Sequence, residues 1–164
     1  MRALIRRAQR GDGEAFIQLM EQQKERMKRV AFGFFRNEED AADAIQETML
    51  NAFEHLGDLR KPEYFRTWLI RILLNNCTRI YNSNKKYVSG EGDLWEKESI
   101  SDGTVEFLEL LYSIPEDSRI FFQLYYGEKF TTREIARSLG MKENTVKSKL
   151  LRGRKQLERE LKKA

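Results

Sequence analysis

Apolar residues recur at three- and four-residue spacings through the first half of the chain, as expected for helices that each bury one face. The first stretch covers residues 14 to 36, and Asp12 is placed to cap its start. A second helix is predicted from about Glu38 to Leu56, and a third after Pro62. With the basic opening segment, these predict an N-terminal helical bundle. The core-facing positions expected in the second and third helices are Ala42, Ile45, Met49, Phe53, Leu56, Phe65, Trp68, Leu69, Ile72 and Leu73.

The apolar repeat stops between residues 81 and 103, where the chain is polar and holds three glycines and four serines. This composition is typical of a flexible linker. Leu94, Trp95 and Ile100 are exceptions, because large apolar side chains are costly to leave in water. We expect them to dock on a surface, either of this chain or of a partner.

The last third of the chain has the pattern of a second helical unit. One helix is expected over residues 104 to 114, and Pro115 suits the first turn of the next. Thr131 and Glu134 have the spacing of a capping box, which would start a short third helix. A final helix is predicted from about residue 142, with its inward positions at Val146, Leu150, Leu157 and Leu161.

These patterns predict an all-α protein in three parts. An N-terminal bundle over residues 1–80 is followed by a linker over residues 81–103 and a four-helix domain over residues 104–164. A polar linker of this length indicates that binding partners set the relative placement of the two domains.

The last two helices have the spacing of a helix-turn-helix. Ala136 is small where the helices would cross, and Gly140 suits a left-handed turn. Val146 and Leu150 would lock the second helix onto the first. This order of features indicates DNA binding rather than only a solvated charged helix. The outward residues expected to meet DNA are Glu143, Asn144, Lys147, Ser148, Lys149, Arg152 and Arg154.

Asn144, Ser148 and Arg152 are the expected base readers on that face. An arginine can bind guanine through two hydrogen bonds, and an asparagine can bind adenine in the same way. Residues 142 to 163 carry nine basic residues against three acids, so the lysines are expected to contact phosphates.

Charge divides the middle of the chain into two blocks. Residues 38 to 58 hold seven acids and no Lys or Arg, whereas residues 59 to 86 hold seven basic residues against Glu63 alone. The first block should repel a polyanion, and the second should attract one. This predicts two partners on adjacent surfaces, one a protein and one a nucleic acid.

The acidic block places Asp40, Asp43 and Glu47 on one helix face beside Gln46. Three such acids could bind a divalent cation, but a metal site normally takes ligands from a second element. The single histidine, His55, lies two turns away, so a metal site is not expected. A solvated face and a protein-docking face are the two interpretations left open.

The basic block combines basic and amide groups with aromatic side chains. Such combinations bind single-stranded nucleic acid, whose backbone charge and bases are contacted together. Trp68 is assigned to the core, and the loop over residues 58–64 is the expected entry point for an unstacked base. The candidate contacts are Arg60, Lys61, Tyr64, Arg66, Arg71, Asn75 and Arg79.

The remaining sequence features argue against other classes of protein. The only cysteine, Cys77, lies in an apolar helical pattern and is expected to be a buried, inert thiol. There is no apolar run near 18 residues, no signal peptide and no lipidation motif, so a cytoplasmic protein without membrane insertion is expected. No phosphate-binding glycine loop, CxxC or nucleophile–base pair is present, which predicts no enzymatic activity and no cofactor.

Four segments together resemble a known family. They are GDGEAF at residues 11–16, EEDAADAIQETMLNAFEHL at 38–56, FRTWLIRILLN at 65–75, and the terminal helix-turn-helix. In this order they resemble the bacterial RNA polymerase sigma factors of the extracytoplasmic-function (ECF) type, in their two-domain form. The resemblance covers almost the whole chain.

The resemblance implies partners for the two charged blocks. Asp43, Gln46 and Glu47 match positions that dock on the clamp of the largest polymerase subunit, and a flap of the second-largest subunit is a further partner. The loop over residues 58–64 and Asn75 match elements that capture a flipped base of the minus-ten promoter element. The linker matches the segment that threads toward the active-site and RNA-exit channels. Residues that match the minus-thirty-five reading helix are Lys147, Ser148 and Arg152.

The family is commonly controlled by an anti-sigma factor, often membrane-anchored, and the resemblance implies such a partner here. Ile70 departs from the pattern, since many members carry an aromatic residue there. The loop residues 60–63 are particular to this chain, so its preferred minus-ten base does not follow from the resemblance. Two rivals remain: a self-sufficient helix-turn-helix regulator that senses a ligand or dimerises, and a metal-dependent nuclease or deaminase that uses the acidic cluster.

Overall fold

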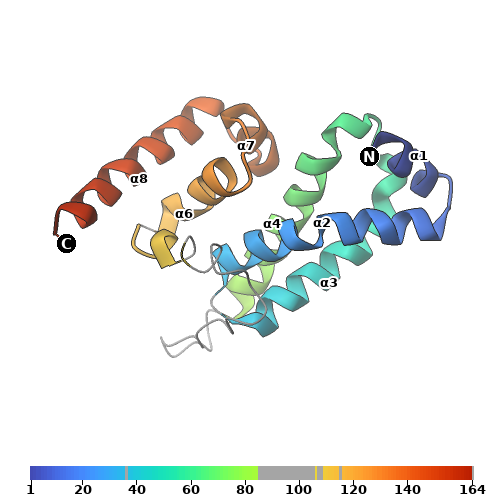
Figure 1. Cartoon of the computed structure of the whole chain (residues 1–164), viewed down its shortest axis with the longest axis horizontal. Coiled ribbons are helices and arrows are strands. Elements are labelled where there is room, and N and C mark those ends of the chain that lie inside the picture. Colours follow the sequence, from blue (N-terminus) through green and yellow to red (C-terminus); the bar gives the residue numbers. More distant parts are fainter. Residues whose placement is uncertain (36, 85–105, 107–108, 115, 164) are drawn as a thin grey trace.

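In the part of the chain that the structure describes, α-helices with short 3-10 turns build the N-terminal half, and further helices with a π turn follow in the C-terminal half (Figure 1). The computed structural model describes residues 1–35, 37–84, 106, 109–114 and 116–163, and these hold helices and turns without a β-strand. The predictions for Leu94, Trp95, Ile100 and Pro115 fall outside the described residues. The bounds are α1 Arg2–Gln9, α2 Gly13–Phe34, α3 Glu38–His55, η1 Leu56–Asp58, η2 Pro62–Tyr64, α4 Phe65–Asn84, α6 Glu116–Phe122, η3 Gln123–Gly127, α7 Thr132–Leu139 and α8 Glu143–Lys163.

The helix starts follow the capping chemistry of the sequence. The Asp12 side chain accepts a hydrogen bond from the Ala15 N–H at 3.1 Å and caps α2, as predicted. At α7 the Glu134 N–H donates to the Thr131 hydroxyl, and the Glu134 carboxylate accepts from the Thr131 N–H, which confirms the capping box. Gly140 ends α7 in the left-handed conformation at φ +65°, also as predicted.

The core of α3 differs from the sequence prediction. Ala42 is exposed and the Phe53 side chain is 67% exposed, whereas the buried positions are Ala41, Ala44, Thr48 and Ala52. The reason is that α3 packs against both α2 and α4, and close approach on two sides selects small side chains along the contact line. The larger residues Ile45 and Met49 lie at the edges of that contact, half-buried.

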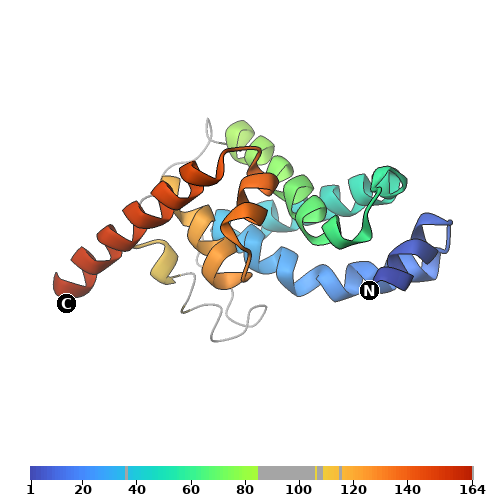
Figure 2. The same cartoon turned by 90° about the horizontal axis from the view of Figure 1, so that it is seen from above.

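Other expectations for the helices are partly met. In α4, Phe65, Leu69 and Leu73 are buried as predicted, and α4 runs to Asn84, so residues 81–84 are helical rather than part of the linker. Leu161 is 62% exposed rather than inward, because the C-terminal end of α8 projects past the other helices (Figures 1 and 2).

The two halves pack against each other in this structure. Helix α7 lies beside α4, and α6 and η3 contact α2, so that a single cluster of buried apolar side chains runs through both halves (Figure 2). Cys77 is buried in it, and burial raises the pKa of its thiol to about 12. The thiol is therefore protonated and inert near neutral pH, as its apolar surroundings predicted.

Gly153 of α8 yields a test of this packing. A Cβ atom at this position would come within 2.3 Å of Cε2 of the buried Phe122 ring. Helix propensity favours Gly153→Ala by about 1 kcal/mol, but we expect overpacking to dominate and to lower the free energy of unfolding by about 1–3 kcal/mol. Urea unfolding measures the change.

Gly57→Ala is the matched control, because a Cβ there meets no heavy atom within 4 Å. This variant should leave the free energy of unfolding within about 1 kcal/mol of the wild type. A stabilised Gly153→Ala protein would show that α8 does not approach α6 this closely.

Candidate polymerase and nucleic-acid interfaces

The acidic residues of α3 share one face of the helix. Asn37 starts the helix by accepting the Asp40 N–H at 2.7 Å, and it also donates to the Asp40 carboxylate at 2.9 Å. Asp40 therefore serves partly as a cap, whereas Asp43 and Gln46 are exposed and Glu47 is half-buried. Residues 38–58 hold seven acids and no Lys or Arg, so the surface of α3 and of the turn after it is strongly electronegative.

Large apolar side chains continue the acidic face toward the end of α3. Leu50 follows Gln46 by one turn and is 59% exposed, and Phe53 lies one turn further on. The Phe53 ring rests edge-on against Phe16 of α2 at a centroid distance of 5.4 Å, and the neighbouring Ile17 is 62% exposed. Exposed apolar groups beside charges are typical of protein-docking surfaces. The sequence analysis missed them, because it assigned Phe53 to the core.

The metal alternative gains no support from this geometry. Among the described residues, no group of three or more His, Cys, Asp or Glu side chains is placed to hold a metal ion. His55 instead lies 3.3 Å from an Asp58 carboxylate oxygen. Within the ranges of the chain that the structure describes, no helix is both long enough and apolar enough to cross a bilayer.

The basic face of α4 presents residues at four-residue intervals. Arg71, Asn75 and Arg79 are all exposed and follow one line along the helix, as the sequence predicted. The adjacent Asn76 points the other way and is buried, where it donates to the Thr48 hydroxyl at 3.0 Å. The two asparagines thus have different environments, and only Asn75 is available to a ligand.

The other predicted single-strand contacts lie at the start of α4. Arg60, Lys61 and Tyr64 are exposed around η1 and η2. The Tyr64 ring lies under the Arg137 guanidinium of α7, 4.8 Å from its centroid, and hydrogen bonding from Arg137 lowers the Tyr64 pKa. Arg60, Lys61 and Tyr64 form one exposed edge before α4. This edge continues into the exposed line of Arg71, Asn75 and Arg79.

Arg66, a predicted single-strand contact, is turned toward α7 in this structure. Its guanidinium donates to the Glu134 carboxylate at 3.0 Å and lies 4.3 Å from the centroid of the Phe130 ring. Burial opposes ionisation of Glu134, but hydrogen bonds from the Thr131 N–H and from Arg66 hold its pKa below the ordinary value. Glu134 therefore serves both the capping box of α7 and the contact with α4.

The helix-turn-helix forms as predicted between α7 and α8. Ala136, Val146 and Leu150 are buried between the helices, and Gly140 makes the turn. Along α8 the residues Asn144, Lys147, Ser148 and Arg152 are exposed, and Lys149 is half-buried.

Several of the predicted DNA contacts in α8 have partners within the domain, and Glu143 and Arg154 show this most clearly. The Glu143 carboxylate accepts from the Thr132 hydroxyl at 3.2 Å and lies 3.7 Å from the Lys147 ammonium, so it ties the start of α8 to α7. The exposed Arg154 donates to the Tyr126 hydroxyl at 2.8 Å, next to η3. These contacts give both residues an intramolecular role that the spacing did not predict.

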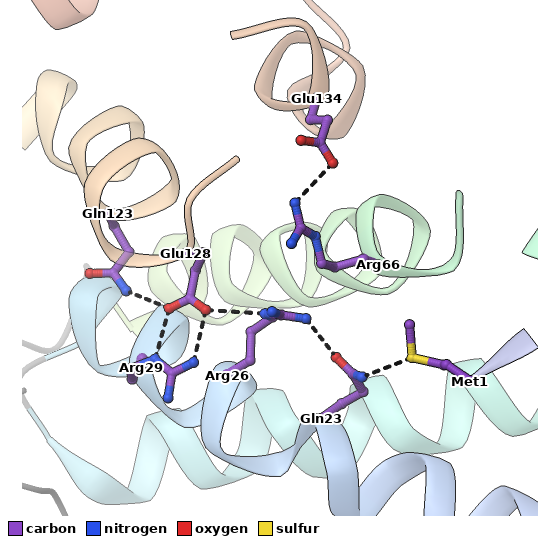
Figure 3. A network of polar contacts seen from close by, with 8 residues as sticks. All are labelled: Met1, Gln23, Arg26, Arg29, Arg66, Gln123, Glu128 and Glu134. Atoms are coloured by element: carbon purple, nitrogen blue, oxygen red, sulfur yellow. Dashed lines mark hydrogen bonds and ion pairs between the residues drawn. The ribbon is translucent and has the colours of Figure 1, made fainter. Parts of the chain in front are cut away.

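A buried carboxylate in the C-terminal half was missed by the sequence analysis. Glu128 is 3% exposed and binds Arg26 and Arg29 of α2 (Figure 3). Burial lowers the pKa of Arg26, whereas the hydrogen bond to Glu128 raises that of Arg29. The partners are about a hundred residues apart in the chain, so no local pattern could have predicted the contact.

Two family models match the chain. The model described as Sigma-70 region 2 matches residues 19–87, and the one described as Sigma-70, region 4 matches residues 100–157. The first match includes the acidic face of α3 and the basic face of α4, and the second includes the helix-turn-helix.

Curated proteins of similar sequence belong to one class. The ECF RNA polymerase sigma factor SigM of Mycobacterium tuberculosis H37Rv is 29% identical over 153 residues, covering 91% of this chain and 78% of SigM. The ECF RNA polymerase sigma factor SigW of Bacillus subtilis 168 is 27% identical over 176 residues, covering 96% of this chain and 94% of SigW.

Solved structures resemble the fold over nearly the whole chain. CnrH in complex with the cytosolic domain of CnrY aligns with a TM-score of 0.76 at 25% identity, covering 98% of this chain and 96% of CnrH. The sigma factor RpoE in complex with the anti-sigma factor NepR, from Bartonella quintana, has a TM-score of 0.72 at 19% identity and shares the fold. It covers 90% of this chain and 96% of RpoE.

The lowered pKa of Glu134 predicts how stability depends on pH. Its ordinary pKa is 4.5 and the folded state lowers it, so the stabilisation is present above that value and is lost as the pH falls through the folded pKa. We expect wild type to be more stable than Glu134→Gln near pH 7, with the gap closing below about pH 4.5. Urea unfolding across pH 3–7 measures it.

Glu134→Gln isolates the charge, because glutamine also completes a capping box. Thr131→Ala is the comparison, since it removes the cap but keeps the Arg66 ion pair. A gap between wild type and Glu134→Gln that stays constant over this range would contradict a role for the Glu134 charge.

Proposed function

Since this chain belongs to the ECF sigma factors of bacterial RNA polymerase, we propose that its acidic α3 face docks on polymerase while its basic α4 face opens promoter DNA. The protein binds core RNA polymerase and directs sequence-specific promoter recognition and transcription initiation. Its division of labour follows the two domains proposed from the sequence, except that the first extends to Asn84 at the end of α4.

One observation carries this proposal: opposite charges occupy neighbouring helices of one bundle. Helix α3 packs directly against α4, yet α3 displays Asp43 and Glu47 while α4 displays Arg71 and Arg79. A protein docked on α3 would therefore lie next to any strand bound along α4. A self-sufficient DNA-binding regulator has no need of this pairing, and an enzyme acting through the acids would need the metal cluster that the described residues do not form.

The partners follow from the chemistry of each surface. The acidic and apolar face of α3 suits the clamp of the largest polymerase subunit, and the C-terminal domain is proposed to reach the flap of the second-largest subunit. The exposed line of α4 and the loop before it suit the unstacked minus-ten strand. The exposed face of α8 suits the major groove of the minus-thirty-five element.

The mode of control is also a proposal. CnrH and RpoE are found with CnrY and with the anti-sigma factor NepR, which supports regulation of this chain by an anti-sigma factor during a stress or envelope response. The protein would act in the cytoplasm, where transcription takes place, as a specificity subunit without turnover of its own.

Single-round transcription with core polymerase, combined with permanganate footprinting, tests this function. Wild-type protein should make thymines near the start site reactive only when polymerase is present. A ligand-sensing regulator would instead bind duplex DNA strongly alone and open none of it. A nuclease or deaminase would alter the DNA in a metal-dependent way.

Asp43→Arg tests the docking face. Reversing an exposed charge at the centre of the acidic face should weaken core binding by roughly tenfold or more, since like charges would then oppose a basic partner. Binding to labelled core measures this, with thermal unfolding as the check on folding. Glu21→Arg, at an exposed acid of α2 outside the predicted set, should keep wild-type affinity. Unchanged binding of Asp43→Arg would remove this role of α3.

Arg152→Ala tests the recognition helix. We expect it to weaken binding to minus-thirty-five DNA by about 1–3 kcal/mol and to relax discrimination at one base pair. Competition between promoter and scrambled duplexes, measured on the holoenzyme, separates base reading from phosphate contact. Arg154→Ala should reduce specificity less, because Arg154 is already bound to the Tyr126 hydroxyl. Equal loss on both duplexes would make Arg152 a phosphate contact.

A further inference from the structure

Helix α1 is bound to the loop before α4 through the side chain of Gln9. The Gln9 Nε2 atom donates to the Leu59 carbonyl at 2.7 Å and to the Leu56 carbonyl at 3.0 Å. These acceptors lie 47 and 50 residues further along the chain, at the end of α3 and at the start of the loop over residues 58–64. We call the two hydrogen bonds the Gln9 bridge.

The orientation of the Gln9 amide follows from its partners. Backbone carbonyls only accept hydrogen bonds, so the atom that faces Leu56 and Leu59 must be the amide nitrogen, which has two hydrogens to donate. The Gln9 Oε1 atom in turn accepts from Nη1 of Arg6 at 3.1 Å, three residues earlier in α1. Both ends of the amide are therefore bound, and a side chain without the nitrogen cannot replace it.

Helix α1 is itself held in place, so it can act as a fixed support. Its Ile5 side chain is 1% exposed and belongs to the buried core. After the helix, Gly11 makes the turn to α2 at φ +97°, and Arg7 donates across this turn to the Asp12 carboxylate at 2.8 Å. Gln9 lies between these two anchors.

The Gln9 bridge fixes the backbone directly before two exposed cations. The Leu59 N–H donates to the carbonyl at the end of α3 at 3.2 Å, and the Tyr64 N–H donates to the Lys61 carbonyl at 3.0 Å. Between these two turns, Gln9 binds the Leu59 carbonyl, whereas Arg60 and Lys61 are exposed. The path of the chain into Arg60 thus depends on a side chain from a distant helix.

An exposed ion pair makes a second link between α1 and the loop. Arg2 lies 3.2 Å from the Glu63 carboxylate, and both side chains are more than half exposed. Exposed pairs of this kind contribute little, because water and salt screen their charges. The Gln9 bridge is partly buried, and it is therefore the contact that can hold the loop.

A fixed loop matters for a site that receives an unstacked base. A loop that becomes ordered only on binding loses conformational freedom at that step, and this loss weakens the complex. A loop held in one geometry also selects more sharply, because its groups cannot adjust to the wrong base. The support of the loop therefore affects both affinity and base preference.

We propose that Gln9 is a positioning residue for base capture: through its bridge, α1 holds the loop over residues 58–64 in the geometry that selects a base of the minus-ten strand. The inference rests on the proposed function, since it needs this loop to receive that base. It gives a role to α1, which precedes the segment, residues 19–87, that matches the region 2 family model. Gln9 acts through the loop and not by contact with DNA.

Hydrogen exchange in the full chain tests the support directly. In the free wild-type protein, the amides of Leu59 and Tyr64 should exchange slowly, and fast exchange of both would overturn the inference without any variant. Gln9→Met keeps an unbranched side chain of similar length and helix propensity but removes the donor. We expect exchange at Leu59 to become roughly fivefold faster in this variant. Thermal unfolding checks that the variant is folded.

Base preference in the holoenzyme tests what the support does. Core polymerase with wild-type or variant protein selects from a duplex library in which the minus-ten and minus-thirty-five segments are randomised, and DNA in heparin-resistant complexes is sequenced. With Gln9→Met, the enrichment of the preferred base at the captured minus-ten position should fall roughly fivefold. Preference in the minus-thirty-five segment should stay within about twofold of wild type, because that surface is distant. A merely structural defect would lower both preferences together.

Gln22→Met is the matched control, since it makes the same change at an exposed glutamine of α2. It should keep the wild-type exchange in the loop and the wild-type base preference. If Gln9→Met leaves the exchange unchanged, or loosens the loop without reducing base preference, Gln9 is not a positioning residue. Should Gln9→Met fail to fold, Gln9→Asn gives the same test, because it is one methylene too short to reach both carbonyls.

Selection by the wild-type holoenzyme separates this inference from the function beneath it. If wild type shows a base preference in the minus-ten segment and Gln9→Met keeps it, the positioning role is wrong and the proposed function stands. If the wild-type holoenzyme shows no such preference, the proposed roles of the loop and of α4 fail, and the inference fails with them.

Discussion

The close packing of α3 between α2 and α4 is the constraint on which the surfaces of this protein depend. Small buried side chains at Ala41, Ala44 and Ala52 let the helices approach, and the Thr48 hydroxyl bridges the Ala44 carbonyl and the Asn76 amide. Because the face of α3 with small side chains packs inward, its acidic face must point outward. The same contact orients α4, whose buried Asn76 places the adjacent Asn75 at the surface. The acidic surface of α3 and the basic surface of α4 are thereby held at a fixed spacing by one seam of polar and apolar contacts.

Contacts across the two halves differ in kind from that seam. Within the N-terminal half, small apolar residues meet along whole helices, which gives a permanent interface that loses contacts outright if it opens. Between the halves, the shared apolar cluster is joined by ion pairs of Glu128 with two arginines and of Arg66 with Glu134, in which charged groups exchange water for one another. Ionic contacts of this kind fix an orientation while leaving a modest net free energy for a partner to overcome. The two halves are thus joined by an apolar cluster and by a few specific ion pairs.

Local rules predicted the elements well because their causes are local. Asp12, the Thr131–Glu134 capping box and Gly140 act within a few residues, and the structure confirms each of them. The buried face of α3 was predicted one residue out of register. Ala42 and Phe53 fit a helical repeat, but they do not fit a helix that packs on two sides. The contact of Glu128 with Arg26 and Arg29 lay beyond any such rule, because these residues come from distant segments and their burial depends on how the halves meet.

Arg66 shows how one residue can belong to two mutually exclusive surfaces. Its position before the exposed line of α4 suits a nucleic-acid contact, yet its guanidinium here is shared between a carboxylate and an aromatic ring of the other half. A planar cation of this kind can pair with a carboxylate or with a phosphate, and it can stack on an aromatic ring or on a base. At this point of α4, Glu134 and Phe130 of the C-terminal half thus offer the same two kinds of contact as a nucleic acid. A nucleic acid that bound Arg66 through the same groups would therefore have to replace both of these contacts.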